Sequence, residues 1–261
     1  MPKVFVTTSW DDDDRSDLKL AELLSTYRIT GTFYVSTGKL GTGSCLSAAD
    51  IRSLAAADFE IGSHTVSHPI LPSLSGQVLV NEVSDCKKVL QQILSSEVSM
   101  FCYPKGRFNS EVVDAVRNVG YRGARGAQML SLGTKIDPFA IPVTIQAYPH
   151  GRSSYVRNLL RRGAVGALLK STPDLLRCRD WIDLGKTTFD RALRHGGIWH
   201  LYGHAWEIER LNLWPQLREM LEYVSRRPEV AYITNSQILD TPAQLASDTT
   251  LATLGGAGKL S

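Results

Sequence analysis

The stretch Val4-Phe-Val-Thr-Thr-Ser-Trp-Asp-Asp-Asp-Asp14 joins an apolar, β-branched run to four consecutive carboxylates. The apolar run predicts a buried strand over Lys3–Ser9, and the aspartates follow where that strand leaves the core. Four adjacent like charges repel one another and are costly to bury without partners. We therefore interpret the aspartate run as a site that binds a cation or takes part in catalysis.

A second segment, Ile61-Gly-Ser-His-Thr-Val-Ser-His-Pro69, places His64 and His68 four residues apart. On a helical turn this spacing would put both imidazoles on one face, within reach of a single ion. One carboxylate and two histidines leave coordination positions open for water and substrate, which is typical of a catalytic divalent site. Alone, these histidines would be ordinary surface residues, but together with the aspartate run they predict metal ligation.

Strands and helices alternate along most of the chain. Further strands are predicted at 31–36, 59–62, 98–103, 121–124, 141–147, 198–203 and 230–234. Helices are predicted at 17–27, 47–58, 75–95, 110–119, 153–169, 187–194 and 212–225. This alternation predicts an α/β fold with parallel strands and crossover helices, either as an open sheet or as a barrel.

The length of 261 residues suits one large domain, because α/β barrels of this size form single units. We predict a catalytic domain over 1–240, with an insertion at about 126–182 that prolines break up. The glycine-rich end, 241–261, is predicted to be a flexible tail.

Composition excludes several classes of protein. The net charge of +3 is weak, and no basic stripe with interleaved aromatics is present, so we expect no nucleic-acid partner. No apolar run approaches the ~20 residues needed to span a bilayer, and the amino terminus does not resemble a secretory signal. The four cysteines lack CxxC spacing, so we expect a cytoplasmic protein with free thiols. The sequence does not indicate an oligomeric state.

The candidate residues all follow predicted strands. The aspartate run follows the first strand, His64 and His68 follow 59–62, Pro104-Lys105-Gly106 follows 98–103, and His204 follows 198–203. Active sites of parallel α/β barrels lie at this carboxyl edge of the strands. The sequence thus predicts that these residues meet in one site.

Four segments, taken in order, resemble the polysaccharide deacetylase family, the metal-dependent carbohydrate esterases of the nodulation-deacetylase type (carbohydrate esterase family 4). They are Thr-Ser-Trp-Asp-Asp, Ser-His-Thr-Val-Ser-His-Pro, Phe-Cys-Tyr-Pro-Lys-Gly and the late histidine. The resemblance spans about residues 4–235. It implies a single-domain distorted (β/α) barrel of about seven β/α units.

The resemblance also implies roles for five residues. Asp11 would be the general base, Asp12 a metal ligand with His64 and His68, and His204 the general acid that protonates the leaving amine. The implied cofactor is one divalent ion. Zinc is expected from the ligand types, and cobalt, nickel or manganese are alternatives.

The chain departs from the family pattern at three positions. Asp13 stands where the family usually has glycine, and Cys102 and Lys105 stand where better-known members have arginine and tyrosine. The backbone N–H of Lys105 can still serve the oxyanion, because it does not depend on the side chain. Arg125, after the strand at 121–124, is the best replacement for the missing arginine that orients the base, and Arg122 is the second choice.

Other residues in these segments have ordinary interpretations. Asp13 and Asp14 are expected to be solvated or to lie at a helix amino terminus. His195 and His200 are expected to be structural or exposed, and Trp199 and Trp206 to be core residues. For Trp206, two residues after His204, a place in the wall of a substrate pocket is the alternative. Glu207, three residues after His204, is a candidate to hold that histidine protonated or to contact the substrate.

The leading functional hypothesis is metal-dependent hydrolysis of an N-acyl group, expected to be acetyl, from an amino sugar. A first alternative is a deformylase or deacylase of a nucleotide- or lipid-linked sugar, or of another small biosynthetic amide. The basic residues Arg152, Arg157, Arg161 and Arg162 would then bind phosphate, although they also fit the solvated face of a helix. A second alternative is a catalytically silent relative that binds sugar.

Overall fold

A sheet of eight parallel strands forms the centre of the protein in the computed structural model, which describes residues 4–133 and 136–241. The strands are β1 (Val4–Asp11), β2 (Thr32–Val35), β3 (Glu60–Ser63), β4 (Met100–Cys102), β5 (Gly123–Arg125), β6 (Ile145–Gln146), β7 (Gly197–Gly203) and β8 (Val230–Tyr232). Their order is β5-β4-β3-β2-β1-β7-β6, with β8 beside β1. Because all pairs are parallel, every strand ends at the same edge of the sheet.

Strand β1 is the central strand. On one side it pairs with β7 over Val4–Trp10, and on the other side it pairs first with β8 and then with β2. Seven of its eight residues are buried. A parallel strand covered on both faces is expected to be apolar throughout, which explains the unbroken apolar run in the sequence.

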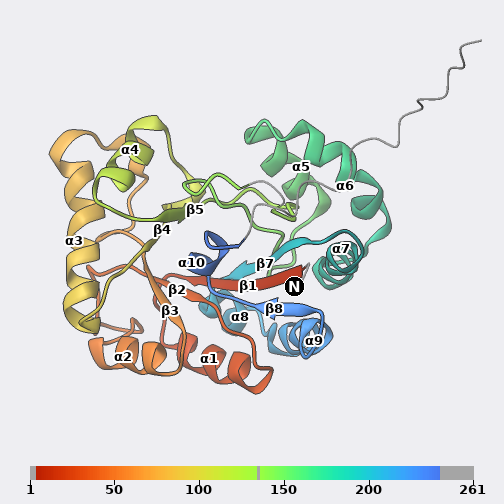
Figure 1. Cartoon of the computed structure of the whole chain (residues 1–261), viewed down its shortest axis with the longest axis horizontal. Helices are drawn as coiled ribbons and strands as arrows, with labels where there is room; N and C mark the ends of the chain where they lie inside the picture. Colours follow the sequence, from red (N-terminus) through yellow and green to blue (C-terminus); the bar gives the residue numbers. More distant parts are fainter. Residues whose placement is uncertain (1–3, 134–135, 242–261) are drawn as a thin grey trace, which may run out of the picture.

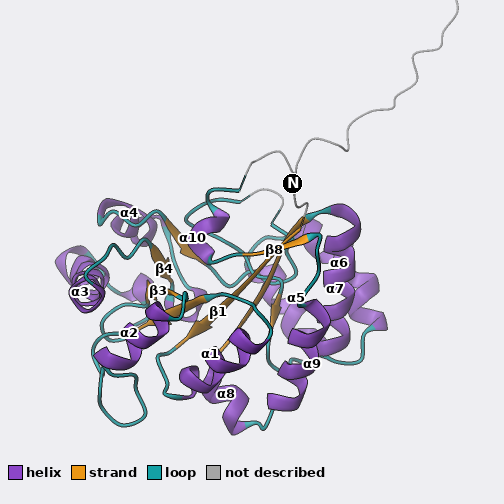
Figure 2. Ribbon diagram, turned by 60° about the horizontal axis from the view of Figure 1, so that its bottom comes forward, coloured by secondary structure: helices purple, strands orange, loops and turns teal. Residues whose placement is uncertain are grey.

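The sheet curls toward a barrel (Figure 2). Arg125, at the end of β5, forms a parallel bridge with Ile141, and the chain after Ile141 continues directly into β6. The two outer strands of the sheet are therefore linked through residues 141–146. Because β6 itself has only two residues, this part of the barrel is irregular. The predicted distorted α/β barrel is confirmed.

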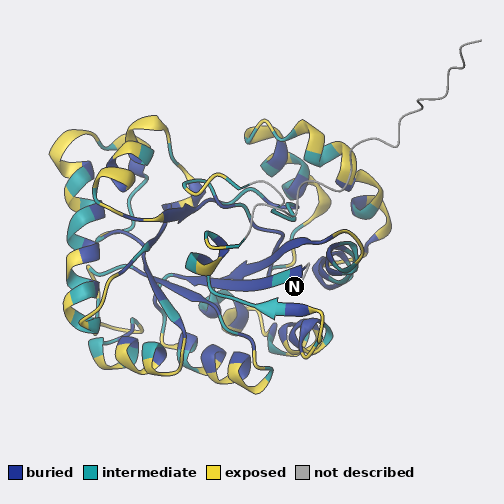
Figure 3. Ribbon diagram, viewed as in Figure 1, coloured by how far each residue is buried: buried dark blue, intermediate teal, exposed yellow. Residues whose placement is uncertain are grey.

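Helices surround the strands (Figure 1). They are α1 (Ser16–Thr26), α2 (Ala48–Ala56), α3 (Gly76–Leu94), α4 (Ser110–Asn118), α5 (Arg152–Arg161), α6 (Val165–Arg177), α7 (Trp181–His195), α8 (Ala205–Arg210), α9 (Trp214–Val224) and α10 (Asn235–Ile238), with short 3-10 turns η1 (Leu71–Ser73) and η2 (Pro104–Gly106). Buried residues gather on the strands and on the helix faces turned toward them (Figure 3). Ser47 and Asp50 form a reciprocal capping box at the start of α2.

The helix predicted at 153–169 is wrong in extent. The chain forms α5 and α6 instead, because α5 ends at Arg161 and Gly163 adopts a φ of +65°, which interrupts a right-handed helix. Helices α8 and α10 were not predicted, and α7 begins before the predicted residue 187. Helices α8 and α10, of six and four residues, are too short for a clear apolar period.

The predicted insertion at 126–182 contains β6, which belongs to the same sheet, together with α5 and α6. Its status as an insertion stays a prediction. Apart from Thr241, the predicted tail lies outside the described residues. None of the helices in the described ranges has both the length and the apolar character required to cross a bilayer.

His200, on β7, is a structural histidine of the core, as expected. It is 1% exposed, its Nδ1 donates to the carbonyl of Pro142 at 3.2 Å, and its Nε2 accepts from the Ser9 hydroxyl at 2.8 Å. Both ring nitrogens are thus satisfied in the neutral form. Burial, with a further effect from the positive charge of Arg125, lowers the pKa of His200 to about 3.

We expect this histidine to weaken the fold in mild acid. Below the unfolded pKa of 6.5 the unfolded chain takes up a proton that the folded chain refuses until about pH 3, so stability falls as the pH falls through that window. Between pH 7 and 5 the loss is about 2 kcal/mol. Urea unfolding should show this loss in the wild type and not in His200→Gln, and equal losses in both proteins would contradict the assignment.

Candidate active site

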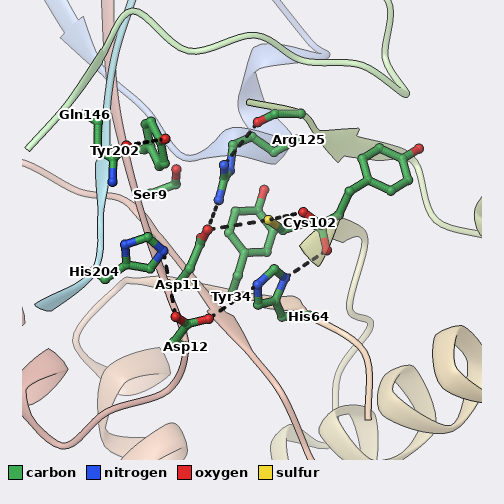
Figure 4. Close-up of polar contacts among 12 residues, drawn as sticks. Ser9, Asp11, Asp12, Tyr34, His64, Cys102, Arg125, Gln146, Tyr202 and His204 are labelled. Carbon is green, nitrogen blue, oxygen red and sulfur yellow. Dashed lines mark hydrogen bonds and ion pairs between the residues drawn. The ribbon is translucent and has the colours of Figure 1, made fainter. Parts of the chain in front are cut away.

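The candidate residues meet at the carboxyl edge of the strands (Figure 4). Asp11 and Arg125 are the last residues of β1 and β5, and Cys102 is the last residue of β4. His64 and His204 directly follow β3 and β7. The parallel sheet therefore brings together residues that are up to 193 positions apart in the sequence, as His204 and Asp11 are.

Asp11 is held by Arg125. Its Oδ2 accepts a charge-assisted hydrogen bond from Arg125 Nη2 and a weak one from the Cys102 thiol, whose sulfur lies 3.7 Å away. Its Oδ1 is buried and has no hydrogen-bond partner among the described residues. Burial alone would raise the pKa of Asp11, but the positive charge of Arg125, aided by His64 and His204, outweighs burial and lowers it. Asp11 is therefore an ionised carboxylate with one occupied and one available oxygen.

Arg125 occupies a closed environment between strands. It is 1% exposed, its Nη1 donates to the carbonyl of Gly126 at 3.0 Å, and its guanidinium faces the rings of Tyr34 and Tyr202 at 5.5 and 4.9 Å. These contacts fix the guanidinium, whose Nη2 bonds Asp11 Oδ2. The second choice, Arg122, is exposed and pairs with Asp240 at 2.6 Å, away from the site.

Asp12 faces three histidines. Its Oδ1 lies 3.6 Å from His64 Nε2 and 3.4 Å from His68 Nε2, and its Oδ2 lies 3.7 Å from His204 Nε2. Donor atoms of Asp12, His64 and His68 all lie within 4.8 Å of one another. The three residues named as metal ligands are therefore brought together.

The expectation of a helical turn between these histidines is wrong. Residues 64–68 form an irregular loop in which Thr65 and His68 have φ values of 72° and 58°. The loop is held by Glu82, whose carboxylate accepts from the backbone N–H groups of Val66 and Ser67. Positive φ values reverse the chain so that His68 turns back toward Asp12.

The donor chemistry fits a divalent metal. His64 Nδ1 donates to the carbonyl of Cys102 at 2.8 Å, which directs Nε2, the nitrogen with the free lone pair in the neutral ring, toward Asp12. Such an outer hydrogen bond is the usual way that a ligating histidine is oriented. A second cluster of Asp11, His64 and Cys102 is less suitable, because burial raises the pKa of the Cys102 thiol and Asp11 is already bound by Arg125.

His204 faces Asp12 Oδ2, whereas His64 and His68 face Oδ1, and His204 is held by Glu207. Its Nδ1 donates to Glu207 Oε2 at 2.6 Å, one turn into α8. Burial would lower the pKa of His204, but the bond to Glu207 and the charges of Asp11 and Asp12 outweigh burial and raise it. Trp206 also belongs to the site, because its Nε1 donates to Asp12 Oδ2 at 3.1 Å.

Lys105 lies on the η2 turn with a φ of 55° and an exposed side chain.

The two aspartates after Asp12 form hydrogen bonds to nearby backbone groups. Asp13 Oδ1 accepts from the backbone of Ser36 at 3.1 Å, and Asp13 is buried, so the expectation that it is solvated is wrong. Asp14 Oδ1 accepts from Ser16 at the first turn of α1, as a helix-terminal acid was expected to do.

Sequence reasoning missed a polar network behind His204. Gln146 Nε2 donates to Glu207 Oε2 at 3.3 Å, while Gln146 Oε1 accepts from Tyr202 at 2.6 Å and from His150 at 2.7 Å. Gln146 is the last residue of the short strand β6. The one signal that could have identified Gln146 was its position at the end of a strand. A strand of two residues is too short for its end to be located from the sequence.

Part of the chain matches a known protein family. Residues 1–124 match the model of the family described as polysaccharide deacetylase. YxkH of Bacillus subtilis (strain 168), whose name assigns it to the polysaccharide deacetylases, is 27% identical over 100 residues. That match covers 38% of this chain and 36% of the relative, so the chain spans about a third of the curated relative's length.

Solved structures share the fold over nearly the whole chain. A structure from Mycobacterium smegmatis, assigned to the polysaccharide deacetylases, has a TM-score of 0.62 at 14% identity and covers 99% of this chain and 96% of its own. A CE4 family pseudoenzyme from Bacillus anthracis has a TM-score of 0.53 at 16% identity and covers 90% of this chain and 65% of its own. At these identities the two structures support the fold.

Proposed function

Because residues 1–124 match the polysaccharide deacetylase family, we propose that this chain is a member of it and removes an N-acetyl group from an amino sugar by metal-dependent hydrolysis. The observation that supports this most is the pairing of two adjacent carboxylates with different partners. Asp11 is gripped by a buried arginine, whereas Asp12 faces His64 and His68. Environments that differ this much let neighbouring acids take different roles.

Asp12, His64 and His68 would hold the ion. Two imidazoles and one carboxylate suit zinc, with cobalt, nickel or manganese as alternatives. When bound, the ion supplies Lewis acidity that polarises the amide carbonyl and makes water more acidic. The three residues come from two loops that the parallel strands place at one edge.

Asp11 would act as the general base. Arg125 occupies Oδ2, so Oδ1 is the oxygen available to accept a proton from the attacking water. The same arginine keeps the carboxylate from turning toward the ligand group and becoming a further ligand. The backbone N–H of Lys105, on the η2 turn, is the proposed donor to the oxyanion.

His204 would act as the general acid. The bond from Nδ1 to Glu207 fixes the ring and favours the protonated form, so that Nε2 carries the proton. Nε2 lies on the Asp12 side of the ring, where the leaving nitrogen must form. Donating this proton to nitrogen turns a poor leaving group into a neutral amine.

The direct test is elemental analysis of the purified protein, followed by an amine-release assay on a panel of N-acetyl amino sugars. We expect one divalent ion per chain, and equal amounts of acetate and free amine from at least one sugar. Metal-loaded protein that binds sugar without releasing amine would instead support the silent sugar-binding alternative. The cytoplasmic location predicted from the sequence remains part of this proposal.

Replacing Arg125 with lysine should slow the reaction while leaving the metal in place. Lysine keeps the charge but loses the planar guanidinium that bonds Asp11 and the Gly126 carbonyl together, so Asp11 is held less well. We therefore expect kcat to fall by about tenfold or more, which corresponds to ~1.4 kcal/mol of transition-state stabilisation. Steady-state kinetics and metal content measured on the same sample provide the check. Arg122→Lys, at the exposed position just before β5, is the matched control and should behave as the wild type. Undiminished kcat in Arg125→Lys would remove Arg125 from the mechanism.

A further inference from the structure

A cavity of about 610 Å³ lies between the η2 turn and helix α5. Five of its lining residues are basic, namely Lys105, Arg107, Arg157, Arg161 and Arg162, and none is acidic. The reaction proposed above uses none of these side chains. Four of the five are exposed to solvent, and together the five give the cavity a positive potential that attracts anions.

One face of α5 forms a wall of the cavity. Ser154, Arg157, Asn158 and Arg161 line it, and their spacing of three and four residues places them along a single helix face. Asn158 fixes this wall to the chain after β5, because its amide accepts from the backbone of Met129 at 2.9 Å and donates to the carbonyl of Ala127 at 2.7 Å. The two arginines are therefore presented by an anchored helix.

The opposite wall is equally fixed. Arg162 donates to the carbonyl of Gly106 and lies over the ring of Phe108 at 5.7 Å. Gly106 has a φ of +61°, and a Cβ there would lie 2.4 Å from Ala127 Cβ, so only glycine allows this close approach. The cavity is thus built by packed residues on both sides.

The charges in the cavity are not neutralised by the protein. Among the described residues, none of the five cations has a carboxylate within 4.0 Å. Asp174 is the single acid in the sequence from 152 to 177, and it pairs with Arg191. An anion that entered the cavity would therefore meet cations free to bind it.

The cavity adjoins the candidate active site. Tyr202 and His150 both line it, and both donate to Gln146, which in turn donates to Glu207, the partner of His204. Lys105 lines the cavity as well, at the end of the loop that follows β4. A substrate whose amide lies at Asp11 and His204 could thus extend one group into the cavity.

We propose that this cavity binds a phosphate group of the substrate, so that the enzyme acts on a phosphorylated N-acetyl amino sugar. The inference deepens the proposed function and rests on it for the identity of the reaction. Phosphate suits the cavity better than a carboxylate, because it carries up to two charges and offers acceptors to several guanidinium forks at once. Asn158 and Ser154 add neutral donors beside the arginines.

The test measures binding and turnover separately. Titration calorimetry of the metal-loaded full chain uses N-acetylglucosamine 1-phosphate, UDP-N-acetylglucosamine and N-acetylmuramic acid, which carry a phosphate monoester, a diphosphate and a carboxylate. In Arg157→Gln/Arg161→Gln we expect Kd for a phosphorylated sugar to rise about tenfold or more. Preference for the monoester or the diphosphate shows which source of phosphate the cavity takes.

Arg52→Gln/Arg218→Gln is the matched control. It removes the same charge from exposed positions on α2 and α9, so Kd should stay at the wild-type value. Single variants Arg157→Gln and Arg161→Gln, checked by thermal unfolding, separate loss of binding from loss of folding. Equal weakening in the cavity variant and the control, or an effect on N-acetylmuramic acid alone, would overturn the phosphate site.

The two proposals fail in different ways. If a neutral N-acetylglucosamine oligosaccharide is hydrolysed but no phosphorylated sugar binds in the cavity, the phosphate site is wrong and the deacetylase assignment stands. If phosphorylated sugars bind through Arg157 and Arg161 but no amine is released from any sugar, the cavity assignment stands and the reaction is wrong.

Discussion

Asp11→Asn is expected to lower the rate of amide hydrolysis about a thousandfold while the protein keeps its metal. An amide side chain cannot accept the proton from the attacking water, yet asparagine preserves the shape of the residue that Arg125 holds. Asp11 lies outside the set of Asp12, His64 and His68, so the ligands are untouched. Acetate release and metal content, measured on the same preparation, provide the check.

The neighbouring substitution should behave differently. Asp12→Asn removes a charged ligand and is expected to weaken metal binding first, with activity recovering in part at high metal concentration. The two carboxylates separate in this way because one ends β1 and the other begins the loop, with a φ of 80°. If Asp11→Asn lost the metal and Asp12→Asn kept it, the assignment within the aspartate run would be off by one residue.

The second large effect is loss of the ion. We expect His64→Ala and His68→Ala each to weaken metal binding about a hundredfold or more, because even loss of an outer hydrogen-bond partner costs 10–100-fold. Competition with a chelator, followed by elemental analysis, measures this directly.

His195→Ala is the control for these variants, since His195 is an exposed residue at the end of α7 and should leave metal binding unchanged. His64 is buried, so thermal unfolding of each variant must be measured alongside. Full metal occupancy in both His64→Ala and His68→Ala would place the ion elsewhere.

Much of the fold was predictable because parallel strands have a strong sequence pattern. The apolar run of β1 and the alternation of strands and helices predicted a parallel α/β fold, either an open sheet or a barrel, and the family resemblance implied the barrel. The polar residues after each strand predicted where the site lies. The place of Arg125 was also predictable, because a residue ending the strand after β4 must point to the same edge. The structure puts its guanidinium against Asp11.

Other features depended on contacts that no local pattern records. The loop that turns His68 back toward Asp12 relies on positive φ values and on Glu82, which lies in α3, fourteen residues after His68. Trp206 was expected in the core, with a place in the pocket as the alternative, and its indole N–H donates to Asp12. The link from Gln146 to His204 joins a two-residue strand to α8, and such long-range pairs form only when the chain has folded.

The central claim is that one ion, held by Asp12, His64 and His68, enables hydrolysis of an N-acetyl amino sugar. The most direct measurement strips the protein with a chelator, returns zinc in steps, and records acetate release at each step. We predict no activity in the stripped protein and a linear rise that stops at one equivalent per chain, with no rise in Asp11→Asn. Full activity in the stripped protein, or no acetate from any N-acetyl amino sugar at full zinc occupancy, would contradict the claim.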